Sequence, residues 1–185
     1  MHLLLDTSVL SEARRPEPIA EVKRFLKSLP TGVVAIPPPV IFELERGARL
    51  LGTNEPERAK RFLDWLDDLL DTTVHVPVIG AEVSRIVARM AAMPKFRKFW
   101  GSDRKLQFGC DPTIAAIAIH YRMPIASRDI RDFLSIHEEF PLPGLYEPFH
   151  ATWIVPPDKE WGTALREDPT DVEDERLFQY EAVFR

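Results

Sequence analysis

The sequence predicts an α/β fold of three layers, in which helices cover both faces of a mostly parallel central sheet. Short, largely apolar runs recur along the chain, at 3–5, 33–36 and 124–127. Such runs are typical of strands that are buried on both faces. Longer segments with apolar residues at helical spacing separate them. This alternation of strands and helices favours a parallel sheet with short crossover connections.

The first half of the chain is expected to supply three strands. A short helix through Val9 and Leu10 follows the first apolar run, and Pro30-Thr31-Gly32 is a turn signal that ends the next helix. The three prolines at 37–39 are expected to close the second strand and to lead into a further helix. The expected elements are strand 3–5, a short helix, helix 19–29, strand 33–36, helix 40–51, helix 55–71 and strand 74–76.

The second half is expected to add one more central strand and one edge strand. The expected elements are helix 81–93, a polar and basic loop at 95–109, helix 112–121, strand 124–127, a loop at 140–148 and edge strand 151–155. Thr170-x-x-Glu173 has the pattern of a capping box before a helix that would run to Phe184. We therefore expect an α/β domain at 1–156 and a short acidic, helical C-terminal extension at 157–185.

Composition restricts the class of protein. Of 185 residues 45% are hydrophobic and 29% charged, an ordinary globular mixture, and one cysteine allows no disulfide within the chain. No apolar run approaches transmembrane length, so a cytoplasmic protein without a membrane partner is expected. The net charge is −5, and residues 151–185, with four basic and nine acidic side chains, account for all of it. Residues 1–150 are therefore neutral overall, which does not suggest tight nonspecific binding to nucleic acid.

Four carboxylates stand where predicted strands end and helices begin. Asp6 follows the first strand, Glu43 lies one turn into the helix after the second, and Asp129 follows strand 124–127. Asp111 precedes Pro112 and is expected to be a helix N-cap. The carboxyl ends of parallel strands share one edge of the sheet, so these side chains are expected to lie close together. Like charges at about 4 Å repel by roughly 4 kcal/mol at an effective dielectric constant near 20, which a bound cation would relieve.

Oxygen ligands alone suit Mg²⁺ or Mn²⁺ rather than zinc or copper. A divalent ion held by carboxylates activates water and supports in-line displacement at phosphorus. Each acid also has an ordinary structural explanation. Asp6 and Asp111 would be helix caps, Glu43 an exposed helical residue and Asp129 a turn residue. The metal-site hypothesis is favoured because one geometric expectation covers all four.

Other chemistries fit the sequence less well. A haloacid-dehalogenase phosphatase needs an aspartate two residues after Asp6, where Ser8 stands, and a receiver domain needs paired acids before it. The chain has no phosphate-binding loop motif and no His-Glu-x-x-His zinc motif. Cys110 precedes a helix, but His120 lies about 15 Å further along it and cannot act as its base. Cys110 is therefore interpreted as a packing residue.

Four segments in order resemble the PIN-domain ribonucleases, in the toxin branch of VapBC toxin–antitoxin systems. They are Leu4-Leu5-Asp6-Thr7-Ser8-Val9, Phe42-Glu43-Leu44-Glu45-Arg46-Gly47, Asp111-x-x-Ile114-Ala115-Ala116-x-Ala118 and Ser127-Arg128-Asp129-x-x-Asp132-Phe133. Order and spacing agree over about residues 2–133. The chain departs from the pattern at Pro112, and its Trp153-Ile154-Val155-Pro156 element comes late and is followed by the acidic extension.

The resemblance implies a PIN-like nuclease domain at 1–156 that cleaves RNA with Mg²⁺ or Mn²⁺. It implies that Asp6, Glu43, Asp111 and Asp129 form the acidic metal site, with Ser8 and Asp132 supporting them. It also implies a homodimer and inhibition by a small cognate antitoxin. The alternative is a catalytically idle PIN-like module that acts through protein or RNA contacts.

Two further hypotheses concern surfaces. Lys95, Arg97, Lys98 and Trp100, with Phe96 and Phe99 between them, are predicted to contact RNA through phosphates and stacked bases. The acidic extension would cover this segment when RNA is absent, or would be a solvated appendage without contacts. On helix 55–71, an apolar set is expected to pack either across a two-fold axis or on the chain's own sheet; it comprises Trp65, Leu66, Leu69 and Leu70.

Overall fold

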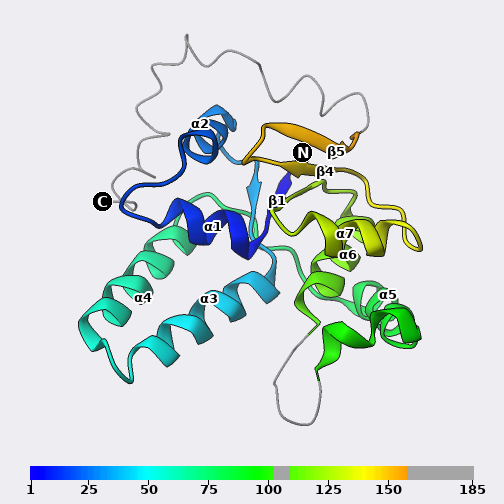
Figure 1. Cartoon of the computed structure of the whole chain (residues 1–185), viewed down its shortest axis with the longest axis horizontal. Coiled ribbons are helices and arrows are strands. Elements are labelled where there is room, and N and C mark those ends of the chain that lie inside the picture. The colour runs from blue at the N-terminus through cyan, green and yellow to red at the C-terminus, as the bar shows by residue number, and fades with distance from the viewer. Residues whose placement is uncertain (102–108, 158–185) are drawn as a thin grey trace.

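The computed structural model describes residues 1–101 and 109–157, and these build a five-stranded sheet with helices on both sides (Figure 1). The strand order is β2-β1-β3-β4-β5, and only β5 runs antiparallel to its neighbour. The expected mostly parallel α/β fold is thus confirmed. The strands are β1 (Leu3–Leu5), β2 (Val34–Ala35), β3 (Ile125–Ala126), β4 (Leu145–Glu147) and β5 (Thr152–Val155).

β1 lies between β2 and β3, which explains why its sequence is wholly apolar. Leu4 pairs with Ala35 on one side and with Ile125 on the other. The three leucines of β1 are almost completely inaccessible to solvent, because helices cover both faces of the strand. The polar residues that directly follow β1 and β3 therefore emerge from the core at the same edge of the sheet.

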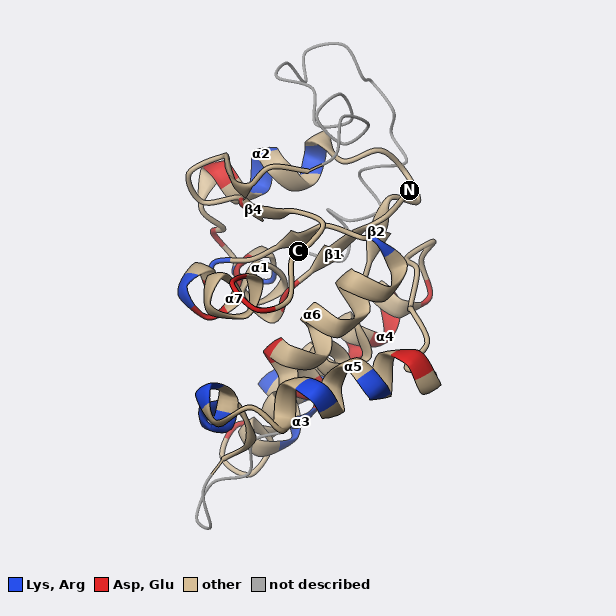
Figure 2. Ribbon diagram, turned by 90° about the vertical axis from the view of Figure 1, so that its right-hand side faces the viewer, with Lys and Arg blue, Asp and Glu red and all other residues tan. Residues whose placement is uncertain are grey.

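Helices separate the strands along the chain. They are α1 (Thr7–Ala13), α2 (Ala20–Ser28), α3 (Pro38–Leu51), α4 (Pro56–Leu70), α5 (Ala81–Ala91), the 3-10 helix η1 (Pro94–Trp100), α6 (Cys110–Tyr121) and α7 (Ile130–His137). α2 lies on one side of the sheet, where Phe25 stacks on Tyr146 of β4 with ring centroids 5.0 Å apart. α3 to α6 lie on the other side (Figures 1 and 2). None of the helices in the described ranges is long and apolar enough to span a membrane.

Several sequence expectations were wrong in detail. The prolines at 37–39 do not form a separate connection, since α3 already begins at Pro38, where a missing N–H costs nothing. The third strand at 74–76 is reduced to a single parallel bridge between His75 and Ala35. The loop expected at 140–148 contains β4, and α7 was not predicted. The helix predicted at 170–184 lies outside the described residues.

The basic loop expected at 95–109 begins instead as η1. Phe96 is completely buried in the core, so its predicted role in stacking on RNA bases is wrong, whereas Phe99 is 9% exposed. A similar correction applies to α4. Trp65, Leu66 and Leu69 are buried within the described part of this chain, and Leu70 is partly buried against the same core. This apolar set therefore packs within the chain's own core, where α4 lies against α3.

α6 is the central helix of the domain. Residues 114–118 are fully buried, as expected for a helix that is apolar on all sides. Its start differs from the prediction, because the N-cap is Gly109 and Asp111 lies inside the first turn. Gly109 has a left-handed conformation with φ +58°, and a Cβ there would lie 2.8 Å from the Trp100 ring. This glycine lets η1 approach the start of α6 and so fixes where Asp111 is presented.

Gly109→Ala is expected to destabilise the fold by roughly 2–4 kcal/mol, because it combines left-handed strain with overpacking against Trp100. The matched control is Gly47→Ala in α3, where a Cβ meets nothing within 4 Å. That change is expected to stabilise by about 0.5–1 kcal/mol. Urea unfolding of both variants measures the difference, and equal midpoints would contradict the account of Gly109.

Candidate active site

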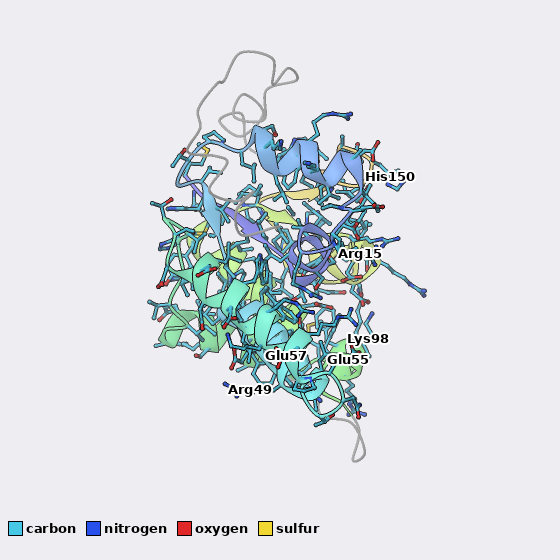
Figure 3. The ribbon with its side chains drawn as sticks, turned by 90° about the vertical axis from the view of Figure 1, so that its left-hand side faces the viewer. Arg15, Arg49, Glu55, Glu57, Lys98 and His150 are labelled. Carbon is cyan, nitrogen blue, oxygen red and sulfur yellow. The ribbon has the colours of Figure 1, made fainter. Side chains whose placement is uncertain are left out.

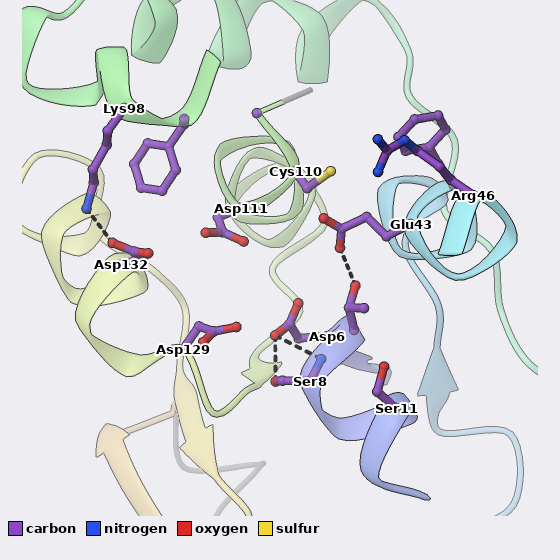
Figure 4. Close-up of a pocket in the computed structure, with 14 residues that line it drawn as sticks. Asp6, Ser8, Ser11, Glu43, Arg46, Lys98, Cys110, Asp111, Asp129 and Asp132 are labelled. Atoms are coloured by element: carbon purple, nitrogen blue, oxygen red, sulfur yellow. Dashed lines mark hydrogen bonds and ion pairs between the residues drawn. The ribbon is translucent and has the colours of Figure 1, made fainter. Parts of the chain in front are cut away.

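A pocket of about 650 Å³ opens at the carboxyl ends of β1 and β3. All four carboxylates singled out from the sequence line it: Asp6, Glu43, Asp111 and Asp129 (Figure 4). They come from four different segments, the ends of β1 and β3 and the starts of α3 and α6. Their side chains point toward a common space in Figure 4. The sequence-based expectation that the sheet edge would gather them therefore agrees with the geometry.

Asp6 is both a helix cap and a member of the pocket. It is the N-cap of α1 and only 2% exposed. Its Oδ2 accepts hydrogen bonds of 2.7 Å from the hydroxyls of Ser8 and Ser127 and a longer contact of 3.5 Å from the Ser8 N–H. The other carboxylate oxygen points toward the space between Asp111 and Glu43 (Figure 4). The two interpretations of Asp6 are thus compatible.

Ser127 is a residue of the site that was not predicted from the sequence. It is fully buried at the end of β3, and its Oγ donates to Asp6 while accepting the Asp129 N–H at 2.9 Å. Ser8 has a parallel role, since its Oγ also accepts the Arg128 N–H at 3.0 Å. The two hydroxyls therefore join the end of β1 to the turn after β3. The sequence does contain a signal for this residue, because a serine at the end of a predicted buried strand stands two residues before a predicted site acid.

Glu43 is held on the opposite side of the pocket. Its Oε2 accepts a hydrogen bond from the Thr7 hydroxyl. Cys110, half-buried next to Glu43, lines the same pocket. Burial, together with the Glu43 carboxylate, raises the pKa of the Cys110 thiol far above its ordinary value. A protonated thiol is a poor nucleophile, which agrees with the sequence interpretation of Cys110 as a packing residue.

The pKa values of Asp111 and Asp129 are raised by burial and by the clustering of the acids. Burial, followed by the charges of Asp6, Asp132, Asp129 and Glu43, raises the pKa of Asp111 from 3.8 to about 7. Burial and the charges of Asp6, Asp132 and Glu43 also raise the pKa of Asp129. In both cases desolvation is the largest cause and like-charge repulsion adds to it. The pocket therefore has more negative charge than its own surroundings balance.

Two lysines of η1 form ion pairs with acidic residues on α7 or directly after it. Lys98 lines the pocket and forms an ion pair with Asp132. Lys95 pairs with Glu138 at 2.6 Å and with Glu139 at 3.1 Å. Trp100 is partly buried beside Gly109. Of the predicted RNA-contact residues, Lys98 is the one that the structure brings to the pocket.

The donor set fits a hard divalent cation by its chemistry, because four carboxylates offer only oxygen ligands. The raised pKa of Asp111 points the same way, since a cation in the pocket would compensate the charge that causes it. Across residues 1–101 and 109–157, no three acidic, histidine or cysteine side chains are already arranged as a group that could hold a metal ion. Side chains would therefore have to draw together around an ion.

Comparisons with known proteins identify the family and the fold. The family model described as PIN domain matches residues 3–138. The structure of FitAcB from Neisseria gonorrhoeae is similar, with 25% identity, a TM-score of 0.59 and coverage of 80% of this chain and 99% of that one. The structure of FitAB bound to an IR36 DNA fragment is also similar, with 26% identity, a TM-score of 0.57 and coverage of 81% of this chain and 97% of that one. VapBC-1 from nontypeable Haemophilus influenzae, at 18% identity, TM-score 0.53 and coverage of 75% and 94%, supports the fold alone. No curated protein sequence matches the chain.

The raised pKa of Asp111 predicts how the metal-free protein responds to pH. Between about pH 3.8 and pH 7, the Asp111 carboxyl is protonated in the folded protein and ionised in the unfolded chain. Stability is therefore expected to fall as the pH rises through that window. Asp111→Asn removes the buried charge. Between about pH 5 and pH 8, its free energy of unfolding should therefore fall less than that of the wild type, by on the order of 2 kcal/mol.

Urea unfolding in EDTA at several pH values measures this effect. The control is Asp68→Asn, an exposed position on α4 outside the pocket, which should keep the wild-type pH dependence. If Asp111→Asn and wild type lose stability in parallel, Asp111 does not bear the predicted charge penalty.

Proposed function

The chain belongs to the PIN-domain family, and from that premise we propose that it is a Mg²⁺- or Mn²⁺-dependent endoribonuclease that cleaves RNA phosphodiester bonds. The observation that carries the proposal is the set of four carboxylates, Asp6, Glu43, Asp111 and Asp129, which line one pocket. We assign them as the metal-binding and catalytic residues. A bound divalent ion would supply an activated water and would offset charge that develops at the phosphate.

The residues around the acids have supporting roles in this proposal. Ser8 and Ser127 hold one oxygen of Asp6 by hydrogen bonds and so aim its other oxygen into the pocket. Thr7 orients Glu43 in the same manner. The ion pair between Lys98 and Asp132 fixes η1 against α7 at the side of the pocket. Groups that are oriented before the reaction avoid the cost of reorganising during it.

RNA is the proposed substrate, and the basic side of the pocket supports it. Lys98 and Arg46 line the pocket together with the acids, and basic side chains neutralise phosphates. Lys95, Arg97 and Trp100 extend this surface along η1. Lys95 and Lys98 have acidic partners on α7, so an RNA strand would compete with those partners for their charges.

The partner proposals follow from the relatives. VapBC-1 of Haemophilus influenzae and FitAB are, by their names, two-component assemblies. We propose that this chain is likewise the toxin of a type II toxin–antitoxin pair, inhibited by a small cognate antitoxin. It would act in the cytoplasm as a homodimer. The apolar surface of α4 that suggested a dimer is buried in the chain's own core. A homodimer would therefore have to form through a different surface.

The rival function is a catalytically idle PIN-like module, and Asp6→Asn separates the two. The change keeps the shape of the side chain and removes one charge. Loss of roughly 3 kcal/mol of transition-state stabilisation should slow RNA cleavage at least about a hundredfold. Titration calorimetry with Mn²⁺ should show weakened binding, while circular dichroism shows an intact fold.

Asp68→Asn is the control for this experiment, because it makes the same chemical change at an exposed site outside the pocket. It should leave both cleavage and Mn²⁺ binding unchanged. Wild-type protein that neither binds Mn²⁺ nor cleaves RNA would favour the idle module. Cleavage by Asp6→Asn at the wild-type rate would remove Asp6 from the site.

Ser127→Ala tests the hydroxyl that sequence analysis missed. Groups that orient a metal ligand typically contribute 10- to 100-fold to metal affinity or activity, so Mn²⁺ affinity is expected to fall by roughly that factor. Ser84→Ala is the control, since Ser84 is exposed on α5 and donates only to a helix carbonyl, that of Gly80. Equal Mn²⁺ affinities in the two variants would show that Ser127 has no part in holding Asp6.

A further inference from the structure

A second hollow of about 470 Å³ adjoins the acidic pocket. It shares Ser8, Ser11 and Asp129 with that pocket, so the two spaces are direct neighbours. The remaining lining is Glu12, Arg15 and Arg128. The hollow therefore places two guanidinium groups beside a cluster of four carboxylates, on the α1 side of Asp129.

Arg128 is fixed in this hollow by both its backbone and its side chain. Its N–H donates to the Ser8 hydroxyl, which also donates to Asp6. Its guanidinium lies 4.8 Å from the centre of the Phe149 ring, a favourable cation–π distance. Phe149 is held in turn, because its N–H donates to the buried Glu147 carboxylate at 3.1 Å. Within the described residues Arg128 forms no ion pair at salt-bridge distance, although its charge acts on the neighbouring Asp129 carboxylate. Its guanidinium donors can therefore reach a ligand in the hollow.

Arg15 is the second cation of the hollow. Glu12, only 3% exposed, accepts the Ile19 N–H with one oxygen and pairs with Arg15 at 3.0 Å through the other. That bond uses one end of a guanidinium with five donors, and the Arg15 side chain remains 61% exposed. Arg15 and Lys98 lie along the same edge of the molecule in Figure 3. Lys98 thus lines the acidic pocket from η1, while Arg15 and Arg128 line the adjoining hollow.

We propose that the hollow formed by Ser8, Ser11, Arg15 and Arg128 binds a non-reacting phosphate of the RNA strand, next to the phosphate that is cleaved. This rests on the proposed function, which brings RNA to the acidic pocket. An RNA strand there adds negative charge to carboxylates that already repel one another, so it needs cationic anchors on each side. Guanidinium groups suit phosphate because they donate two parallel hydrogen bonds. The Ser11 hydroxyl can add a third, whereas the Ser8 hydroxyl already donates to Asp6.

Hydrogen bonds connect the hollow to the carboxylates of the acidic pocket. The Ser8 hydroxyl contacts both Asp6 and the backbone of Arg128, and Ser127 contacts both Asp6 and the backbone of Asp129. A phosphate bound at Arg128 is therefore placed relative to Asp6 and Asp129 by short hydrogen bonds rather than by a long loop. Arg128 acts as a substrate-positioning residue, and Phe149 positions Arg128.

The test is RNA binding in EDTA, where no cleavage takes place, with random-sequence single-stranded RNA of about ten nucleotides, a length that one domain can cover. Fluorescence anisotropy gives the affinity as a function of salt. Arg128→Gln should weaken binding and reduce the slope of log affinity against log salt by roughly 0.7, the value for one lost phosphate contact on a single strand. Arg128→Lys should keep the slope, because it keeps the charge, and should bind with intermediate affinity.

Arg85→Gln is the matched control, since Arg85 is exposed on α5 and lines neither hollow; it should leave affinity and slope at wild-type values. The proposal is overturned if Arg128→Gln and Arg85→Gln have the same slope, or if wild-type protein shows no salt-dependent binding to this RNA. The second outcome would point to a protein ligand. RNA binding through Arg128 by a protein that cleaves no RNA would refute the ribonuclease and keep the phosphate site.

Discussion

Repulsion among four clustered carboxylates is the constraint on which the rest of this structure depends. Three of the acids stand at helix N-termini, Asp6 as the N-cap of α1, Asp129 as the N-cap of α7 and Asp111 in the first turn of α6. The positive end of a helix dipole favours a negative charge at each of these places. Hydroxyl donors add to this at Asp6 and at Glu43. The compensation is incomplete, because the pKa values of Asp111 and Asp129 remain raised. The proposed divalent cation would compensate the remaining charge.

The apolar core is what keeps the acids together against this repulsion. β1 and β3 pair directly, so the residues that follow them cannot move apart without breaking the centre of the sheet. α6 is buried along most of its length, and η1 packs against its start through Trp100 at Gly109. Outside the core, Arg15, Arg128 and Lys98 surround the acids without entering the cluster. An anionic strand would find its counter-charges at the rim and the reactive groups at the centre.

The sequence predicted the parts of the fold that follow from apolar pattern alone. The runs at 3–5, 33–36 and 124–127 became β1, β2 and β3 because fully buried strands need apolar side chains on both faces. The four acids were predictable because they follow such strands or open the next helices. β4 was missed because Leu145-Tyr146-Glu147 lies among prolines and includes an acid. Ser127 and the second hollow were missed because they depend on hydrogen bonds between segments far apart in sequence, which no local pattern records. Phe96 was wrongly assigned to RNA contacts because its charged sequence neighbours concealed that it belongs to the core.

The central claim is that Asp6, Glu43, Asp111 and Asp129 form one divalent-cation site. A crystal structure of the protein grown with Mn²⁺, with anomalous scattering measured at the manganese edge, tests it most directly. The account predicts an anomalous peak in the acidic pocket, at about 2.0–2.2 Å from carboxylate oxygens of at least two of these residues, with water completing an oxygen-only shell. Manganese bound elsewhere, with the acidic pocket lacking an anomalous peak at saturating Mn²⁺, would contradict it.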